Sequence, residues 1–328
     1  MRAEDVLMVR AGLPDWIDSD LLRDWPEDVR LIRIPDHPTA ETAIDFWIPP
    51  LSPKAAVEVF SKLDGVKVVQ SLLAGVDWLL PIVPPGVEVC DGQGLHNVAT
   101  AEWVVAAILA SLKYFPFYAG LQAAGSWSRR IEVNQAYRKL HGIERQFRPP
   151  VLVEELAGKT VLIVGYGSIG RSIEERLLPF QVNVVRVARG AREGVEPVSE
   201  LRSLLPAADV VVLIVPLTAE TTHMMGADEL GLMKRGALLV NAARGPVVDT
   251  AALVDALGSG RIRAALDVTD PEPLPEGHPL WSAPNLLLTP HVAGSSPLFL
   301  VRGMAFAAAQ LRRFIAGEPL LNVVTGEY

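Results

Sequence analysis

The feature that most constrains the fold is a glycine-rich turn set between a strand and a helix. Residues 160–164, TVLIV, form an apolar β-type run, residues 165–170 are GYGSIG, and residues 172–178, SIEERLL, follow in a helical pattern. A G-x-G-x-x-G turn in this context is typical of a Rossmann dinucleotide-binding unit, whereas the glycines alone would be weak evidence. The ordinary alternative is a strand, turn and helix that bind no ligand.

Each glycine of this turn has an expected task. Gly165 makes the tight turn, Gly167 lets the backbone approach a pyrophosphate, and Gly170 lets the helix pack close to the strand. The first helical residues, Ser168 and Ile169, then present free backbone N–H groups to the phosphates. We expect these five residues to bind a dinucleotide cofactor.

Strand-like runs alternate with helical patterns through most of the chain, which predicts parallel sheets with crossover helices. The expected strands are VLMVR, VRLIRI, AIDFWI, VKVVQS and VEVC in the first part, and TVLIVGYG, VNVVRVA, DVVVLIVPL, GALLVNAA, AALDV and NLLLTPH in the second. Long helices are expected at 99–115 and 297–319, and residues 116–150 read as an irregular connection or an interface arm.

This pattern predicts an α/β protein with two doubly wound parallel-sheet domains. A Rossmann cofactor domain, residues 99–296, is expected to be inserted into a flavodoxin-like substrate domain, residues 1–98 plus 297–328. The chain has 328 residues and is 50% hydrophobic, so it can supply a sizeable core to each domain.

Charge and cysteine content exclude several classes of function. The formal net charge of −8 argues against general nucleic-acid binding. Cys90 is the single cysteine, so an intrachain disulfide is excluded, and no metal site is expected. The N-terminus lacks a signal-peptide run, and the apolar stretches are interrupted before they reach bilayer length. We expect a soluble, cytoplasmic protein with neither a membrane nor a nucleic-acid partner.

The end of the second strand of the cofactor domain departs from the usual dinucleotide-binding pattern. Ala188 stands where an acid normally binds the adenosine ribose, and Arg189 comes next. Alanine leaves room for a 2′-phosphate, Arg189 can pair with it through a charge-assisted fork, and Arg192 is a second candidate. Arg186 belongs to the opposite strand face and is expected outside the site. NADP(H) is therefore the expected preferred cofactor, with NAD(H) as a second one; the alternative is that these arginines are solvated loop charges.

Three later segments each place a functional side chain just past an apolar strand. The segments are VNAARGPVVD (240–249), ALDVTDPEPLP (265–275) and LLLTPHVAGSS (286–296), and the side chains are Arg244, Glu272 and His291. In open α/β sheets the carboxyl ends of the strands are where ligands bind. An arginine, a carboxylate and a histidine are therefore expected to meet at one edge of the sheet.

These segments resemble the D-isomer-specific 2-hydroxyacid dehydrogenases over nearly the whole chain. Beyond GYGSIG, the resemblance rests on VPLTAET (215–221), NAARG followed by Asp249, LDV followed by PEPLP, TPHVAG, SLLAGVDW (71–78) and ATAEW. It implies that Arg244 clamps the substrate carboxylate and carbonyl oxygens, that His291 delivers a proton to the forming alkoxide, and that Glu272 holds the imidazole.

The resemblance also assigns binding residues. Leu73, Ala74 and Gly75 would offer backbone N–H groups to the substrate carboxylate, with Leu72 and Leu73 as an apolar wall. Asp267 would hydrogen-bond the nicotinamide amide. The other positions expected beside the cofactor are Pro216, Thr218, Ala242, Ala243 and Gly294. Two residues have open roles: His96, near the expected cleft, and Trp103, which we expect to pack against the other domain or a partner.

The predicted activity is NADPH-dependent reduction of a small 2-keto acid, such as glyoxylate or hydroxypyruvate, to the D-2-hydroxy acid. The alternative is a nucleotide-sensing binding protein of the corepressor type, which the short C-terminal segment after the last helix disfavours. A formate-type dehydrogenase carries an amide where Glu272 stands, which argues against that branch. The family is usually dimeric, so a homodimer is expected through the ATAEW helix and the 116–150 arm.

Overall fold

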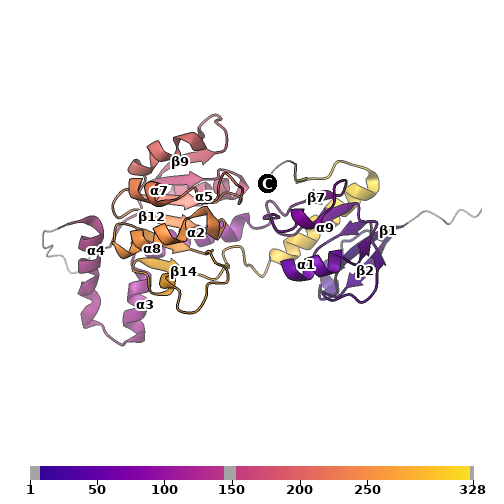
Figure 1. The fold of residues 1–328 in the computed structure, drawn as a ribbon, viewed down its shortest axis with the longest axis horizontal. Coiled ribbons are helices and arrows are strands. Elements are labelled where there is room, and N and C mark those ends of the chain that lie inside the picture. Colours follow the sequence, from indigo (N-terminus) through magenta and orange to yellow (C-terminus); the bar gives the residue numbers. More distant parts are fainter. Residues whose placement is uncertain (1–7, 144–152, 326–328) are drawn as a thin grey trace, which may run out of the picture. The chain divides into compact units, whose positions relative to one another are not determined.

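The computed structural model describes residues 8–143 and 153–325. The chain divides into two compact units, of which unit 1 comprises residues 1–96 and 295–328 and unit 2 comprises residues 97–294 (Figure 1). Unit 2 is therefore an insertion into unit 1. Each boundary lies two residues before the expected one.

Unit 2 is built on a parallel sheet whose strand order is β10-β9-β8-β11-β12-β13-β14. This is the Rossmann order with one strand added, and the order reverses between β8 and β11. The strands are β8 (Thr160–Val164), β9 (Asn183–Ala188), β10 (Glu196–Pro197), β11 (Val210–Leu213), β12 (Leu238–Asn241), β13 (Arg263–Leu266) and β14 (Leu286–Leu288). The strand β10, a two-residue strand at the edge of the sheet, was not predicted from the sequence.

Helices cover both faces of this sheet, because alternate strand residues point to opposite sides. Val161 and Ile163 pack against α2 and α5, and Leu162 and Val164 face the core that includes α6, α7 and α8. Strands buried on both faces read as continuous apolar runs, as TVLIV does. The helices of unit 2 are α2 (Asn97–Leu112), α3 (Phe115–Ala123), α4 (Val133–His141), α5 (Ser168–Leu177), α6 (Leu201–Leu204), α7 (Ala227–Leu232) and α8 (Thr250–Gly258). Its 3-10 turns are η3 (Ser128–Glu132), η4 (Leu178–Phe180), η5 (Val198–Glu200), η6 (Leu205–Ala207), η7 (Gly245–Val247) and η8 (Pro279–Ser282).

Unit 1 has its own parallel sheet, with the strand order β2-β1-β4-β6-β7. When the strands are renumbered along the chain within this sheet, the order is 2-1-3-4-5, which is that of flavodoxin-like folds, as expected. Met304 of α9 packs on one face and Val59 of α1 on the other. The strands are β1 (Val9–Pro14), β2 (Val29–Ile34), β4 (Phe46–Trp47), β6 (Val68–Gln70) and β7 (Glu88–Cys90), and the pair β3 (Thr42–Ala43) and β5 (Leu63–Asp64) lies apart. The helical elements are α1 (Pro53–Phe60), α9 (Phe299–Ala316), η1 (Ser19–Leu22) and η2 (Leu80–Ile82).

The expectation that residues 116–150 form an irregular connection was wrong for the part that is described. Tyr114 adopts a left-handed backbone with φ 56° at the break after α2, and α3 begins at the next residue. Pro116 sits in the first turn of α3, where proline has no hydrogen bond to lose, so it starts a helix rather than ending one. A second helix, α4, ends at Gly142, which has φ 65°. Residues 144–152 lie outside the described residues.

One smaller expectation also changes. The first strand is displaced toward Pro14 relative to VLMVR, since Ala11 and Gly12 pair with both β2 and β4. Trp103 is half-buried and packs against the core beneath α2 in its own unit, and its expected packing against the other domain or a partner stays a prediction. In the described part of the chain no single helix is long and apolar enough to cross a membrane, and α2 and α3, bent by 70°, meet that test only as a pair.

Candidate active site

The glycine turn joins β8 to α5, and its geometry requires glycine at two positions. Gly165 has φ +104°, and a Cβ there would lie 2.3 Å from the carbonyl oxygen of Ile214. A Cβ on Gly170 would lie 2.7 Å from the carbonyl oxygen of Gly165. Gly167 caps α5 and has open space where its Cβ would be. The turn is therefore tight and leaves room for a ligand at the start of the helix.

The helix that follows the turn begins at the position that the sequence predicts. Ser168 is the first residue of α5, and Ile169 packs against the core of unit 2. Free N–H groups at a helix N-terminus, together with the helix dipole, favour an anion. The arrangement fits a dinucleotide pyrophosphate, and the assignment of these residues to it stays a prediction.

The structure gives the three arginines near the end of β9 different surroundings. Arg186 binds the carboxylate of Glu174 on α5, with its Nε donating over 2.8 Å. Arg192 is exposed and donates to the backbone carbonyl of Tyr166 in the glycine turn. Arg189 follows the last residue of β9, is exposed, and its side chain has no ion pair with a described residue. Arg189 and Arg192 therefore have no carboxylate partner among the described residues, whereas Arg186 is already paired with Glu174.

The three expected catalytic residues follow neighbouring strands. The strands β12, β13 and β14 are adjacent and parallel, so their carboxyl ends lie at one edge of the sheet. Arg244 follows β12, Glu272 follows β13, and His291 follows β14. The Arg244 guanidinium donates to the carbonyl of Ala243 over 2.9 Å, which holds the side chain close to its own strand end.

Glu272 and His291 are in direct contact. The distance from His291 Nδ1 to Glu272 Oε1 is 2.6 Å, and the two side chains keep 47% and 41% of their surface exposed. An ionised carboxylate only accepts hydrogen bonds, so Nδ1 is the donor in this pair and Nε2 remains for another partner. His291 also has φ +54°, a backbone conformation that is uncommon for a residue with a side chain. The backbone and the carboxylate together fix the orientation of the ring.

Asp267 holds the turn that carries His291. Its carboxylate accepts hydrogen bonds from the Thr289 hydroxyl at 2.6 Å, from the Val292 N–H at 2.8 Å and from the Ala293 N–H at 2.7 Å. The His291 N–H donates to the Asp267 carbonyl at 2.7 Å. Asp267 is only 2% exposed. Its expected contact with a nicotinamide amide stays a prediction; among the described residues, the hydrogen bonds that its carboxylate accepts come from Thr289, Val292 and Ala293, beside His291.

The other expected cofactor positions lie on loops at the same edge. Thr218 pairs with Thr221 at 3.2 Å, and Thr221 donates to the carbonyl of Pro216 at 2.7 Å, so the loop after β11 is closed by its own side chains. Ala242 and Ala243 directly follow β12. Gly294 is the last residue of unit 2. Their contacts with a cofactor stay predictions.

The loop expected to bind the substrate carboxylate belongs to unit 1. Leu73, Ala74 and Gly75 follow β6 and are half-buried, and the Leu73 N–H is bound to the Ser71 hydroxyl at 3.0 Å. The expectation that Leu72 forms an apolar pocket wall was wrong, because Leu72 is 2% exposed in the core of unit 1. The role of the loop in substrate binding stays a prediction.

Two residues escaped the sequence analysis. Tyr166, inside the glycine turn, donates its hydroxyl hydrogen to Glu174, and Glu174 is 7% exposed. Glu174 looked like one acid of an amphipathic helix, and its burial depends on Arg186, twelve residues away on β9. The sequence feature that could have indicated this cluster is the aromatic residue, Tyr166, between the first two glycines of the turn.

Comparisons with known proteins support this picture. Residues 105–293 match the family model described as "D-isomer specific 2-hydroxyacid dehydrogenase, NAD binding domain". The chain is similar to a glyoxylate reductase of Thermofilum pendens, with 35% identity over 278 residues that cover 82% of this chain and 77% of the relative.

Solved structures agree with this result. A D-isomer specific 2-hydroxyacid dehydrogenase from Xanthobacter autotrophicus, in complex with NADPH and MES, has a TM-score of 0.75 and 29% identity, and the match covers 97% of this chain and 98% of that one. An NADPH-dependent glyoxylate/hydroxypyruvate reductase from Sinorhizobium meliloti, in complex with NADP and sulfate, has a TM-score of 0.78 and 26% identity, and the match covers 96% and 98%.

Proposed function

Since the chain belongs to the D-isomer-specific 2-hydroxyacid dehydrogenases, we propose that it reduces a small 2-keto acid with NADPH. Members of this family are NAD(P)-dependent oxidoreductases that act on small hydroxy and keto acids. Glyoxylate and hydroxypyruvate are the proposed substrates, and the D-2-hydroxy acid is the proposed product. The observation that carries the proposal is the contact between His291 and Glu272 beside the strand that Arg244 follows.

The backbone geometry of the glycine turn fits a bound dinucleotide cofactor. The backbone at Gly165 and Gly170 is too close to neighbouring carbonyls for any side chain, and Gly167 leaves open space at the start of α5. Gly165, Gly167 and the first N–H groups of α5 would hold the pyrophosphate. The bound nicotinamide would supply the hydride.

The three side chains at the strand ends divide the rest of the chemistry. Arg244 would hold the carboxylate and the carbonyl oxygen of the keto acid in its planar fork, which orients the carbonyl carbon. The proton on Nε2 of His291 would pass to the carbonyl oxygen as that oxygen gains negative charge. Glu272 would keep the ring in place through Nδ1 and stabilise the imidazolium before the proton leaves. Histidine would take the proton back in the oxidation direction.

A panel of 2-keto acids assayed with NADPH and with NADH tests the proposal. Turnover of glyoxylate or hydroxypyruvate would support it. A nucleotide-sensing binding protein would bind the dinucleotide without turning over any keto acid. That outcome would leave the glycine turn intact as a binding site and remove the catalytic role of His291.

The preference for NADPH leads to a prediction about residues 188 and 189. We expect kcat/KM with NADPH to exceed that with NADH. The double substitution Ala188→Asp and Arg189→Ala should shift the ratio toward NADH by about tenfold or more, because it removes one charged hydrogen bond and adds a like charge. The measurement is kcat/KM for NADPH divided by kcat/KM for NADH, with the same keto acid at the same concentrations in both assays. An unchanged ratio would show that another residue selects the phosphate.

We further propose a homodimer formed through the α2–α4 region. Large apolar side chains are exposed there, namely Phe115 at 59%, Trp127 at 81% and Ile131 at 55%. Exposed apolar groups of this size often mark protein interfaces. The protein should therefore have twice the 35.5 kDa mass of the chain in light scattering coupled to gel filtration.

The interface can be tested by substitution within the same region. The double substitution Trp127→Asp and Ile131→Asp should give the monomer mass, since it would bury two charges in a two-fold contact. The control is Val57→Asp in α1, an exposed apolar residue (48%) of unit 1, which should leave the mass unchanged. A dimer that survives the double substitution would place the interface elsewhere.

A further inference from the structure

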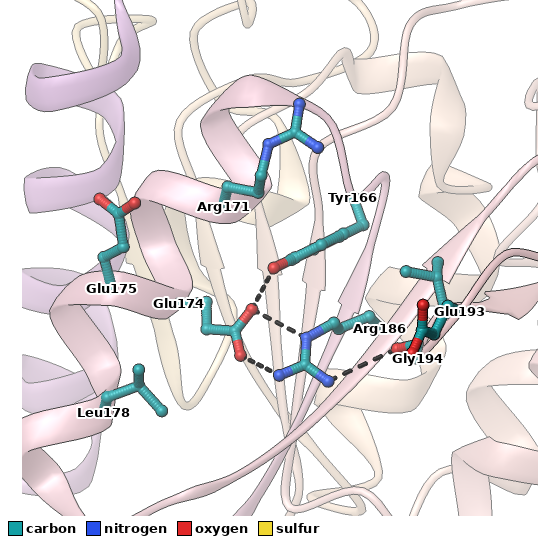
Figure 2. A pocket seen from close by; sticks show the side chains of 9 residues that line it. Tyr166, Arg171, Glu174, Glu175, Leu178, Arg186, Glu193 and Gly194 are labelled. Atoms are coloured by element: carbon teal, nitrogen blue, oxygen red, sulfur yellow. Dashed lines mark hydrogen bonds and ion pairs between the residues drawn. The ribbon is translucent and has the colours of Figure 1, made fainter.

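An open surface pocket of about 370 Å³, with five charged residues in its lining, lies beside the glycine turn, between α5 and β9. Figure 2 shows Tyr166, Glu174 and Arg186 pointing toward one another across it, with Arg171 on the far side of the tyrosine ring. The pocket adjoins the stretch of backbone that would hold the cofactor. Its side chains are therefore placed to influence how the cofactor's adenosine end is recognised.

Glu174 neutralises Arg186 inside this pocket. Arg186 Nε donates to one carboxylate oxygen of Glu174 at 2.8 Å, a second guanidinium nitrogen binds the other oxygen, and the Tyr166 hydroxyl donates to the same carboxylate (Figure 2). The hydrogen bond from Arg186 lowers the pKa of Glu174, so the carboxylate stays ionised. Because Arg186 is already paired with Glu174, its guanidinium is less available to bind a phosphate.

Arg192 lies over the same Tyr166 ring as Arg186, whose guanidinium carbon is 5.6 Å from its centre, but Arg192 has no carboxylate partner among the described residues. Its side chain donates to the Tyr166 carbonyl, and its guanidinium carbon lies 5.9 Å from the centre of the Tyr166 ring. The backbone of Arg192 forms paired hydrogen bonds with Val195, at 3.1 and 2.8 Å, which close the turn that carries it. A carbonyl and an aromatic ring position a cation without cancelling its charge. Arg192 is therefore held at the glycine turn by contacts that leave its positive charge unpaired with any carboxylate of the described residues.

We propose that Tyr166 is a positioning residue for cofactor selection, which holds Arg192 at the glycine turn as a ligand of the 2′-phosphate of NADPH. The inference rests on the proposed preference for NADPH. Holding the guanidinium before the cofactor arrives reduces the conformational entropy lost on binding. Tyr166 also donates to Glu174, so the Arg186–Glu174 pair lies beside the ring, and the ring face is the part of Tyr166 that holds Arg192.

Binding of NADPH and NADH to the resting protein tests this role without depending on turnover. The dissociation constants are measured by fluorescence titration for the wild type, Tyr166→Leu, Arg192→Ala and the double variant. Arg192→Ala should weaken NADPH binding by about tenfold or more, as loss of a charged hydrogen bond implies. Tyr166→Leu should weaken it by about two- to fivefold, as loss of an exposed cation–π contact implies. NADH binding should change little in either variant.

The double variant is the decisive measurement. If Tyr166 acts through Arg192, Tyr166→Leu will cause no further loss of NADPH affinity once Arg192 is alanine. Tyr166→Phe keeps the ring and loses only the hydroxyl, so it should retain most of the NADPH affinity. Arg171→Ala is the matched control, because Arg171 also lies over the ring, at 6.0 Å, and should leave the NADPH-to-NADH ratio unchanged.

The outcomes separate this inference from the proposed function. A wild-type protein that binds NADPH no better than NADH would overturn the cofactor preference, and the role of Tyr166 with it. A wild type that prefers NADPH, combined with equal losses from Tyr166→Leu in both backgrounds, would overturn the role of Tyr166 alone. If Tyr166→Leu loses thermal stability, the test uses Tyr166→Phe and Arg192→Ala instead. Loss of NADPH affinity in Tyr166→Phe would then overturn the proposed role of Tyr166. Normal NADPH affinity in Arg192→Ala would overturn it as well.

Discussion

Replacing His291 with asparagine is expected to lower kcat for keto-acid reduction by at least about a hundredfold, the usual effect of removing a positioned acid–base group. Asparagine is the suitable replacement because His291 has φ +54°, and asparagine tolerates the left-handed region better than most residues. The asparagine amide can still reach toward Glu272, but nothing takes the place of Nε2. The loss should therefore appear in kcat, with a smaller change in KM.

His223 provides a matched control for this experiment. It is also an exposed histidine with positive φ, at 53°, and no catalytic role is assigned to it. His223→Asn should leave kcat unchanged, which separates the loss of a proton donor from the effect of replacing a histidine in a strained turn. Near-normal turnover by His291→Asn would remove His291 from the mechanism. A large loss in both variants would point to the turns and not to the imidazole.

Replacing Glu154 with glutamine is expected to destabilise unit 2 strongly. Glu154 is 7% exposed and lies 2.7 Å from Lys159 Nζ, 2.8 Å from an Arg263 guanidinium nitrogen and 3.2 Å from His141 Nε2. Arg263 is itself only 3% exposed, so it would keep a buried charge whose carboxylate partner is gone and whose remaining hydrogen bond among the described residues is to the Gly236 carbonyl. Breaking a buried ion pair from one side costs about 3–5 kcal/mol. For a unit of this size that corresponds to a fall in melting temperature of roughly 6–20 °C.

Glu155→Gln is the matched control, since the neighbouring glutamate is exposed. Thermal unfolding followed by circular dichroism should show a large fall for Glu154→Gln and almost none for Glu155→Gln. Equal melting temperatures for all three proteins at neutral pH would mean that Arg263 does not depend on Glu154.

The pH dependence of the Glu154 effect has a definite sign. Burial raises the pKa of the carboxyl, but His141, Arg263 and Lys159 outweigh it and lower the pKa to about 2 from its ordinary 4.5. A carboxylate with a lowered pKa stabilises the folded state fully above its ordinary pKa and loses that effect as the pH falls toward the folded value. The difference in melting temperature between wild type and Glu154→Gln should therefore be largest above about pH 5 and shrink toward pH 2. A difference that grows on acidification would contradict this account.

The sequence predicted the strands of unit 2 well because most of them are buried on both faces. Such strands must be continuously apolar, and TVLIV and DVVVLIV show this without any help from the rest of the chain. The strand β10 was missed because its two residues, Glu196 and Pro197, carry no apolar pattern and pair only at the edge of the sheet. The helices within 116–143 were missed because a proline and polar residues resemble a loop until it is known where the helix begins.

The sequence predicted the part of the candidate site that follows from the order of the strands. Arg244, Glu272 and His291 each follow a parallel strand, and neighbouring parallel strands end at one edge, so their approach to one another follows from topology. The 2.6 Å contact between Glu272 and His291, the three hydrogen bonds that Asp267 accepts and the burial of Leu72 do not follow from it. Each depends on side-chain directions set by loops and packing.

The sequence by itself therefore determined the class of fold, the family and the edge of the sheet where chemistry is expected. These properties depend on local patterns, namely glycine spacing, apolar runs and the residues just after each strand, which are readable one segment at a time. The tertiary structure decided which arginine near β9 is paired with a carboxylate and which is not. Arg186 is neutralised by Glu174 and Arg192 is held by Tyr166, and both partners lie on segments that reach β9 only when the sheet has formed. A charge is cancelled or preserved by its neighbours in space, and those neighbours are brought together by folding.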